Sequence, residues 1–364
     1  MSEAPVNLIG KSRGELERLF VAMGEKPFRA RQVMKWLYGR SVLDAASMTD
    51  LSLDLRDRLQ QQADFSLPEI QACERAADGV IKWQLAAGQN QAIETVFIPE
   101  ANRGTLCISS QVGCAMNCSF CATGHQGFNR NLSAAEIVGQ VLLAGRELAD
   151  EGHAQSVTNV VFMGMGEPLA NLRPVLEAID VLTDDLGFGL SRRRVTVSTS
   201  GLVPQIRRLA ESARVALAVS LHAPDDELRN ELVPINRRHP IAELLPVCWD
   251  YVQKTNTKDV TFEYVMLSGI NDDLSHARAL MRLLRNRPAK VNLIPFNPFP
   301  GTDYRRSSAV QVDAFRDILM GAGIMTITRR TRGDDIAAAC GQLAGRVNNR
   351  VRAPLGLKTL GGRA

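Results

Sequence analysis

The sequence predicts an α/β fold in which six or so β/α units form a partial (β/α)6 barrel, preceded by an N-terminal α-helical accessory domain and a small β-ribbon. From residue 104 onward, short apolar runs typical of strands alternate with longer segments of helical apolar spacing. Serial strand–helix units imply a parallel sheet with right-handed crossovers. The chain has 364 residues, 45% of them apolar, which suffices for a barrel with additions.

The N-terminal part is predicted to contain three helices and then the ribbon. Helical apolar spacing covers residues 13–24, 27–38 and 51–62, and Asp50 is a candidate N-cap for the third helix. The second segment, PFRARQVMKWLYGR, mixes Arg and Lys with aromatic residues. That mixture suits contact with nucleic acid, although aromatic residues also fit a core. Residues 69–98 alternate apolar and polar side chains around turn signals, which indicates an antiparallel ribbon.

The chain is expected to divide into four parts: the N-terminal helical domain (residues 1–65), the β-ribbon linker (66–103), the partial barrel (104–330) and a basic C-terminal segment (331–364). The strands of the barrel are expected at residues 105–109, 158–163, 194–198, 215–221, 259–266, 291–295 and 325–328. Its helices are expected at residues 133–148, 172–182, 203–211, 226–232, 241–253, 273–287 and 310–321. Because barrel enzymes place their chemistry at the C-terminal ends of the strands, functional residues are expected directly after these strands.

The net charge is only +4, but basic residues are concentrated in two places. One is the run Arg192, Arg193 and Arg194; the other is the C-terminal part, where only two acidic residues, Asp334 and Asp335, oppose the basic ones. The C-terminal basic residues are Arg329, Arg330, Arg332, Arg346, Arg350, Arg352, Lys358 and Arg363. Phosphate backbones attract such patches, but a solvated surface is equally compatible with a charge run.

Targeting signals are not evident in the sequence. No stretch approaches 18 uninterrupted apolar residues, so no membrane span is expected. The N-terminus has no apolar signal core, and seven cysteines without a secretory signal predict reduced thiols in a cytoplasm.

Three cysteines in the run CAMNCSFC are the strongest functional signal. Cys114, Cys118 and Cys121 have the spacing C-x3-C-x2-C. Three thiolates can hold three irons of a 4Fe–4S cluster and leave the fourth iron open, as a reactive site requires. Phe120 fits an apolar cover over the cluster. The alternatives are a zinc site or unrelated thiols, but structural zinc wants four ligands, and His125 is too close to complete such a set.

Other polar or small residues follow successive predicted strands. In MGMGEP, Gly166 would let the backbone approach a ligand closely, and Glu167 could receive an ammonium group. Singly, such residues are caps, turn formers or satisfied core groups; together at strand ends they predict a ligand site. The remaining candidates, in STSG, SLHA and PFNPFP, are Ser198, Ser220, Leu221, His222 and Asn297.

The motifs CAMNCSFCATG, MGMGEP, VTVSTSG, SLHA and IPFNP, in this order, resemble the RlmN family of radical S-adenosylmethionine (SAM) enzymes. These are adenine carbon-2 methyltransferases of 23S ribosomal RNA and some transfer RNAs. The segments LERLFVAMGEKPFRARQVMKWLY, IETVFIPE and RGDDIAAACGQL also match, so the resemblance covers nearly the whole chain. It implies a radical SAM barrel, an RNA-binding N-terminal domain and a ribbon linker, and RNA rather than DNA or membrane as partner.

The resemblance also implies the cofactors and their ligands. One 4Fe–4S cluster would bind to the three cysteines with SAM on the open iron, two SAM molecules would be used per turnover, and an external flavodoxin-like protein would supply electrons. The SAM contacts would be Gly166, Glu167, Ser198, Ser220, Leu221, His222 and Asn297.

Three further residues receive catalytic roles from the resemblance. Cys340 would take a methyl group from one SAM, and a radical made from a second SAM would remove hydrogen from that methyl. The resulting methylene would bond to carbon 2 of adenine, and Glu94 would remove the carbon-2 proton. Cys107 would then form a transient disulfide with Cys340 and free the methylated RNA. From the residues alone, both cysteines could equally be core and Glu94 a surface carboxylate.

Two other functions are compatible with the sequence. Carbon-8 methylation of the same adenosine, as in the related Cfr enzymes, would use the same cluster and cysteine pair. A non-catalytic ribosome-binding protein with a structural metal would need neither SAM nor the pair. Cys73 and Cys248 match no motif and are interpreted as structural.

Overall fold

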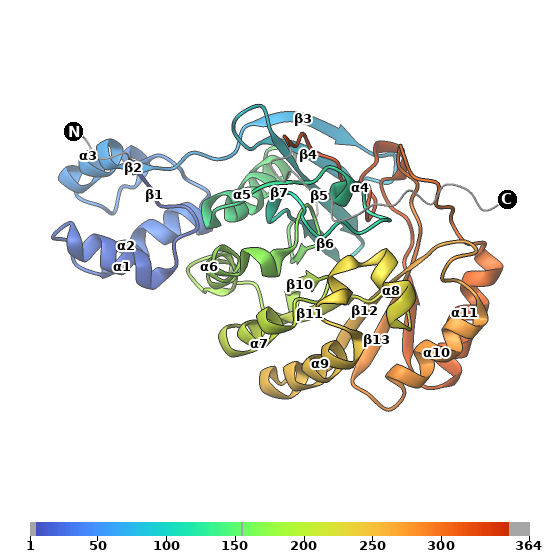
Figure 1. Cartoon of the computed structure of the whole chain (residues 1–364). Coiled ribbons are helices and arrows are strands. Elements are labelled where there is room, and N and C mark those ends of the chain that lie inside the picture. Colours follow the sequence, from blue (N-terminus) through green and yellow to red (C-terminus); the bar gives the residue numbers. More distant parts are fainter. Residues whose placement is uncertain (1–4, 154–155, 349–364) are drawn as a thin grey trace.

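The computed structural model describes residues 5–153 and 156–348 (Figure 1). Its centre is a ten-stranded sheet with the order β14-β13-β12-β11-β10-β9-β6-β5-β4-β3. The seven strands from β6 to β14 in this order are parallel, and the pairs from β3 to β6 are antiparallel. The strands are β3 Ile70–Arg75, β4 Ile81–Ala86, β5 Ala92–Glu100, β6 Arg103–Cys107, β9 Asn159–Phe162, β10 Val195–Thr199, β11 Ala216–Ser220, β12 Val260–Met266, β13 Ala289–Pro295 and β14 Met325–Thr328.

Helices connect the parallel strands and lie along the outer side of the sheet (Figure 1). The connecting helices are α5 Ala134–Asp150, α6 Leu172–Thr183, α7 Val203–Ser212, α9 Ile241–Thr255, α10 Leu274–Leu284 and α11 Ala309–Gly321. Because β3 and β14 end the strand order, the sheet of the described residues stays open. The predicted partial (β/α)6 barrel is confirmed. Among the described helices, none has the length and apolar character needed to cross a membrane.

Local sequence and burial explain these elements. Helix α5 begins with a capping box, in which Ser133 Oγ accepts from the Glu136 backbone N–H and the Glu136 carboxylate accepts from the Ser133 N–H. Strand β12 is buried along its whole length, as expected of a central parallel strand.

The N-terminal part contains the three predicted helices, α1 Arg13–Ala22, α2 Phe28–Met34 and α3 Leu53–Gln62; a π-helical turn, η1 Lys35–Gly39, prolongs α2. A short parallel pair, β1 Val6–Asn7 and β2 Ala63–Asp64, joins its two ends.

The prediction that Asp50 caps the third helix is wrong. Ser52 caps it instead, by accepting from the Leu55 N–H at 3.3 Å. The Asp50 carboxylate accepts from Trp36 Nε1 at 2.6 Å, so the structure uses it to hold a buried aromatic ring. Asp and Ser are both common N-cap residues. Because the Asp50 carboxylate is bonded to the Trp36 indole, Ser52 is the residue that caps the helix.

The ribbon is antiparallel, as predicted, but it continues the barrel sheet. Strand β5 pairs with β6, with Val96 opposite Cys107, and β4 pairs with β5, with Lys82 opposite Val96. The ribbon strands β4 and β5 and the barrel strand β6 are therefore hydrogen-bonded neighbours in one sheet. The boundaries drawn at residues 65, 103 and 330 stay predictions.

Candidate active site

The three motif cysteines lie on the cluster loop (residues 114–121), which a short hairpin supports. The hairpin strands are β7 Gln111–Gly113 and β8 Phe128–Asn131, and the four-residue helix α4 Ala122–His125 lies between the loop and β8. The Cys114 N–H donates to the Gly127 carbonyl at 2.7 Å, and the His125 N–H to the Cys121 carbonyl at 3.2 Å. Both ends of the loop are thus fixed by backbone hydrogen bonds.

The thiols of this loop fit the ligand set of a 4Fe–4S cluster. Burial raises the pKa of each thiol, and the neighbouring charges of Cys114 and Cys121 raise the pKa of Cys118 further, so the three groups are close together. Bound iron would offset the cost of burying these thiolate charges, because metal-bound thiols are deprotonated. In the described part of the chain, no three His, Cys, Asp or Glu side chains could hold a single metal ion. A cluster differs from such a site because its protein ligands bind separate irons.

Apolar residues surround the middle of the cluster loop. Cys118 and Phe120 pack against a small buried cluster that includes Val265, Leu267 and Phe296. The ring of Phe120 therefore has the apolar surroundings that its place in the motif predicts.

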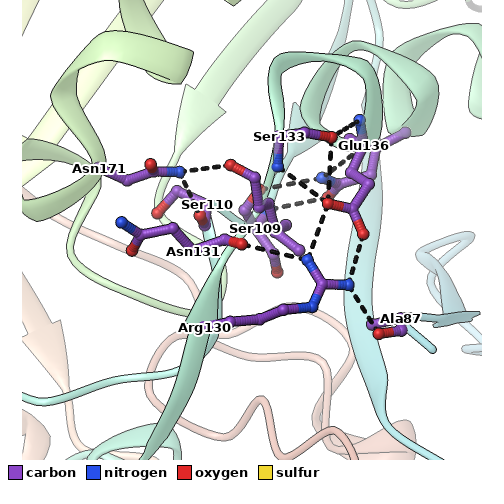
Figure 2. A network of polar contacts seen from close by, with 10 residues as sticks. Ala87, Ser109, Ser110, Arg130, Asn131, Ser133, Glu136 and Asn171 are labelled. Atoms are coloured by element: carbon purple, nitrogen blue, oxygen red, sulfur yellow. Dashed lines mark hydrogen bonds and ion pairs between the residues drawn. The ribbon is translucent and has the colours of Figure 1, made fainter. Parts of the chain in front are cut away.

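A polar network attaches the hairpin to the rest of the barrel (Figure 2). The Arg130 guanidinium donates to both oxygens of Glu136, at 2.9 and 2.6 Å, and to the Ala87 carbonyl at 2.7 Å. Asn171 Nδ2 donates to the Ser110 carbonyl at 2.9 Å. The structure thus holds the cysteine-bearing hairpin against α5, the ribbon and the turn after β9.

Glu167 lies after β9, and it is buried and fully engaged by its neighbours. Its carboxylate accepts from the Ser200 N–H at 2.7 Å, from Ser200 Oγ at 2.8 Å and from the Leu169 N–H at 3.0 Å. Burial raises the pKa of Glu167, and the hydrogen bonds from Ser200 act against that rise. Gly166 has a φ of +101°, and a Cβ there would lie 2.5 Å from Gln111 Cβ, so only glycine fits.

His222 follows β11 and packs against the cluster loop. Its Nδ1 accepts from the Val265 N–H at 3.0 Å, which places the ring proton on Nε2. Its ring lies edge-on to Phe120, with centroids 4.4 Å apart. Burial lowers the pKa of His222 to about 3, so the ring is neutral at physiological pH. These are the contacts of a satisfied buried polar group, and its place among the SAM contacts stays a prediction.

The other predicted SAM contacts also lie at strand ends. Ser198 is buried on β10, Ser220 ends β11, and Leu221 after it is fully buried. Asn297, after β13, donates from Nδ2 to the Cys340 carbonyl at 3.2 Å. Its Oδ1 accepts from Arg306 and Thr331. The structure thus connects Asn297 with the segment that carries Cys340.

That segment, residues 329–348 (the C-terminal segment), lies beside α4 and β4 (Figure 1). The Ala122 N–H donates to the Gly341 carbonyl at 2.8 Å, and Thr123 Oγ1 donates to the Leu343 carbonyl at 2.7 Å. Cys340 is exposed. Arg346 lies in this segment, whereas Arg350, Arg352, Lys358 and Arg363 lie outside the described residues.

Cys107 and Cys340 lie near each other and near the cluster loop. A charge on Cys340 raises the pKa of both Cys107 and Cys121. Burial raises the pKa of Cys107 to about 12, with Cys340 as the next cause and Arg329 acting in the opposite direction. The fold therefore brings together cysteines that are more than 200 positions apart in the chain.

Glu94 lies on β5 and is only 5% exposed, which excludes the surface carboxylate considered from the sequence. Its Oε2 accepts from the Ala344 N–H at 3.0 Å, and its Oε1 lies 3.8 Å from Lys82 Nζ. Lys82 also donates to the Ile336 carbonyl. Burial raises the pKa of Glu94 above its usual value, although the nearby charge of Lys82 acts against this rise. Glu94 and Lys82 thus contact the C-terminal segment on both sides of Cys340.

Sequence reasoning missed several site residues. Arg329 was counted only as part of a basic run, but it lies 3.8 Å from Glu263, and the charge of Cys340 is the main cause that raises its pKa. Its position directly after the last strand was a usable signal. Arg332 of the same run is ion-paired with Asp78 at 2.6 Å. No sequence signal marked Lys82, because its role depends on strand pairing.

Comparisons with known proteins identify the family. Residues 6–65 match the model of the ribosomal RNA large subunit methyltransferase N-terminal domain, and residues 108–281 match that of the radical SAM superfamily. The superfamily match implies a 4Fe–4S cluster and SAM.

Two relatives and one solved structure extend the match to the whole chain. Dual-specificity RNA methyltransferases RlmN from Francisella tularensis subsp. novicida (strain U112) and subsp. mediasiatica (strain FSC147) are each 52% identical, with 99% of both chains covered. The crystal structure of a radical SAM methyltransferase from Sphaerobacter thermophilus is 44% identical, with a TM-score of 0.87, and the match covers 93% of this chain and 99% of that one. The chain therefore belongs to the RlmN family of radical SAM RNA methyltransferases.

Proposed function

We propose that this enzyme methylates carbon 2 of adenosine in 23S ribosomal RNA and in transfer RNA, with Cys340 as the methyl carrier. The observation that carries the proposal is the convergence of Cys340, Cys107 and the cluster loop. The dual specificity named for the relatives supports both classes of RNA. One 4Fe–4S cluster would be held by Cys114, Cys118 and Cys121, and two SAM molecules would be used per turnover.

The low reactivity of adenine carbon 2 explains why a cysteine such as Cys340 would be needed as methyl carrier. Carbon 2 of adenine is electron-poor and cannot attack a methyl donor as an ordinary nucleophile, whereas a cysteine thiolate can. The bound cluster and SAM would supply the methyl group and the one-electron chemistry that activates it. After the loss of one hydrogen atom, the methyl carbon on the Cys340 sulfur would bond to carbon 2 and so join Cys340 to the RNA. The exposure of Cys340 gives it access to a macromolecular substrate.

Glu94 and Cys107 would complete the reaction. Glu94 would take the carbon-2 proton, and the bound cluster would accept the one electron that the radical adduct must also lose. A carboxylate whose pKa burial has raised is a stronger base near neutral pH. Cys107 would attack the Cys340 sulfur: the sulfur–sulfur bond forms, the sulfur–carbon bond breaks, and the released carbon takes a proton to become the methyl group. A flavodoxin-like donor would supply electrons, and a reductant would restore both thiols.

The N-terminal helices and the exposed Arg330 and Arg346 of the C-terminal segment would bind the RNA. Phe28 is 44% exposed with the Arg29 guanidinium 4.8 Å from its ring centroid, and the Arg40 guanidinium lies 4.0 Å from the Trp36 ring. Arginines stacked on aromatic rings next to solvent are a common surface for RNA bases. We place this activity in the cytoplasm, where its RNA substrates are.

The deciding experiment is mass spectrometry of RNA nucleosides after anaerobic reaction with SAM that carries a deuterated methyl group. The proposal expects 2-methyladenosine, identified against authentic 2-methyl and 8-methyl standards, from both RNA classes. The Cys340→Ala variant is the negative control. Formation of 8-methyladenosine instead would show the Cfr-like regioselectivity and overturn the carbon-2 proposal.

A further inference from the structure

Arg229, on α8 Asp226–Leu232, is fully buried next to the ends of β10 and β11. Its Nε donates to the Leu221 carbonyl at 3.1 Å, and its Nη2 donates to the carbonyls of Ser200 at 2.8 Å and Ser220 at 3.0 Å. Its Nη1 donates to Asn236 Oδ1 at 2.6 Å. One planar group therefore joins α8 to the ends of two neighbouring strands.

These strand ends carry residues of the proposed SAM site. Ser220 and Leu221 are themselves predicted contacts, and Ser200 holds the Glu167 carboxylate through its N–H and its hydroxyl. Gly201, with a φ of +112°, leaves space for the guanidinium, since a Cβ there would lie 3.2 Å from Arg229 Nη2. The backbone around the SAM site is thus built around this side chain.

Among the described residues, the charge of Arg229 has no direct counter-ion. Within the described residues, no carboxylate lies at ion-pair distance from it, and its four acceptors are neutral carbonyl oxygens. Asp226, on the same helix, is already bonded to Asn236 Nδ2 and to the Ile241 N–H, both at 2.9 Å. A buried charge without a partner is costly, so an anion brought by a bound group would stabilise it.

The cluster loop, next to α8, is a source of such an anion. Burial lowers the pKa of Arg229 to about 10, and Cys118 is the largest of the groups that oppose this lowering. The Leu232 carbonyl of α8 accepts from the Ser119 N–H at 3.2 Å, so the helix that carries Arg229 contacts the loop directly. A 4Fe–4S cluster on three thiolates, with a SAM carboxylate, brings negative charge to this place.

We propose that Arg229 is a positioning residue for the cluster and SAM: its fork fixes the ends of β10 and β11, and its charge offsets the negative charge of the loaded cluster loop. The proposal rests on the cofactor part of the proposed function. It is independent of whether carbon 2 or carbon 8 is methylated.

The test separates the fork from the charge with two variants of the reconstituted enzyme. Arg229→Lys keeps the charge but loses the planar fork, and Arg229→Met loses both. Arg238→Met, at an exposed arginine nearby, is the matched control. The measurements are iron content, SAM affinity by anaerobic equilibrium dialysis, and the cluster midpoint potential by EPR-monitored titration without SAM.

We expect full iron content in all three variants and about tenfold weaker SAM binding in both Arg229 variants, the size of a lost hydrogen bond to a charged group. Only Arg229→Met should also show a more negative midpoint potential, because reduction adds negative charge that a nearby cation stabilises. Arg238→Met should match the wild type in all three measurements.

SAM affinity within twofold of wild type, together with an unchanged potential in Arg229→Met, would leave only a packing role and overturn the proposal. If Arg229→Met does not fold, Arg229→Lys and Asn236→Ala carry the test. Asn236→Ala keeps the charge and all three carbonyl contacts, so its SAM affinity should stay closer to wild type than that of Arg229→Lys; an equal loss would contradict the proposal. An enzyme that binds SAM normally but yields no methyladenosine would count against the proposed function alone.

Discussion

The cluster loop and the C-terminal segment carry cysteines of the same site but are held differently. The cluster loop is short, its cysteines are close in sequence, and a hairpin tied to α5 fixes it. The C-terminal segment contains a single short 3-10 turn within its described residues, Asp334–Ile336, and is held by scattered polar contacts with the ribbon, α4 and the loop after β13. The difference suits the proposed roles: a metal site needs fixed ligands, whereas a carrier thiol that would meet SAM, RNA and Cys107 in turn is served by contacts that can be exchanged.

The largest expected effect concerns the cluster loop. If each loop cysteine ligates a different iron, as proposed, Cys118→Ala should lose most of the iron and all SAM cleavage. Iron and sulfide analysis with an anaerobic SAM cleavage assay measures both. Cys73→Ala, at an exposed cysteine of β3, is the control and should keep both. Full iron content and normal cleavage in Cys118→Ala would refute the ligand assignment.

The next effect separates the two thiols of the pair. Cys340→Ala should bind SAM and RNA but form neither methylated RNA nor an adduct, because the carrier sulfur is missing. Cys107→Ala should form the adduct and stop there, with RNA covalently held through Cys340. Denaturing gels, nuclease digestion and peptide mass spectrometry detect it. Free product at the normal rate from Cys107→Ala, or an adduct at another residue, would contradict these roles.

A smaller effect is expected at Glu94. Glu94→Gln should lower the yield of methylated RNA by about 10²–10⁴-fold, the usual contribution of a general base, while methyl transfer to Cys340 continues. Glu74→Gln is the matched control, because Glu74 also lies near Lys82, at 3.3 Å, but its side chain is half exposed. Peptide mass spectrometry and nucleoside analysis of the same samples separate the two steps. Equal losses in the two variants would mean that only the charge near Lys82 matters.

The smallest predicted effect is a pH dependence of RNA release. Since the Cys107 pKa is about 12, the thiol form dominates at neutral pH, and the reactive thiolate fraction rises with pH. Release of the adduct should therefore speed up as pH rises, by about tenfold per unit. Arg329→Gln removes a group that lowers the Cys107 pKa and should therefore slow release at each pH. A release rate that is flat with pH and unchanged in Arg329→Gln would show that another step limits turnover.

The sequence predicted the barrel because its signals are local. Strand and helix periods, the spacing of three cysteines and the polar residues after strands are all readable within short windows. The same holds for the ribbon, whose alternation and turns were correctly interpreted. The identity of the helix cap could not be predicted from neighbouring residues, because Asp50 is bonded to the distant Trp36 indole and Ser52 caps the helix instead.

Contacts between distant segments could not be predicted from such windows. The burial of Arg229 among strand-end carbonyls depends on how β10 and β11 align. Arg329, after β14, lies 3.8 Å from Glu263 of β12 only because both strands belong to the same sheet. The resemblance to a family suggested Glu94, Cys107 and Cys340, but not the lysine or the arginines that surround them.

The pairing of the ribbon with the barrel also determines which side chains of β4, β5 and β6 point to the same face of the sheet. Lys82, Val96 and Cys107 lie opposite one another on three neighbouring strands, so their side chains point to the same face, and Glu94, two residues before Val96, shares it. Removing or adding one residue between Glu94 and Val96 would turn Glu94 to the opposite face while leaving Cys107 in place. A one-residue length change in the turn between β5 and β6 would change which residue of β6 lies opposite Val96, because turn length fixes the register of a hairpin. Either change would therefore separate Glu94 from Cys107.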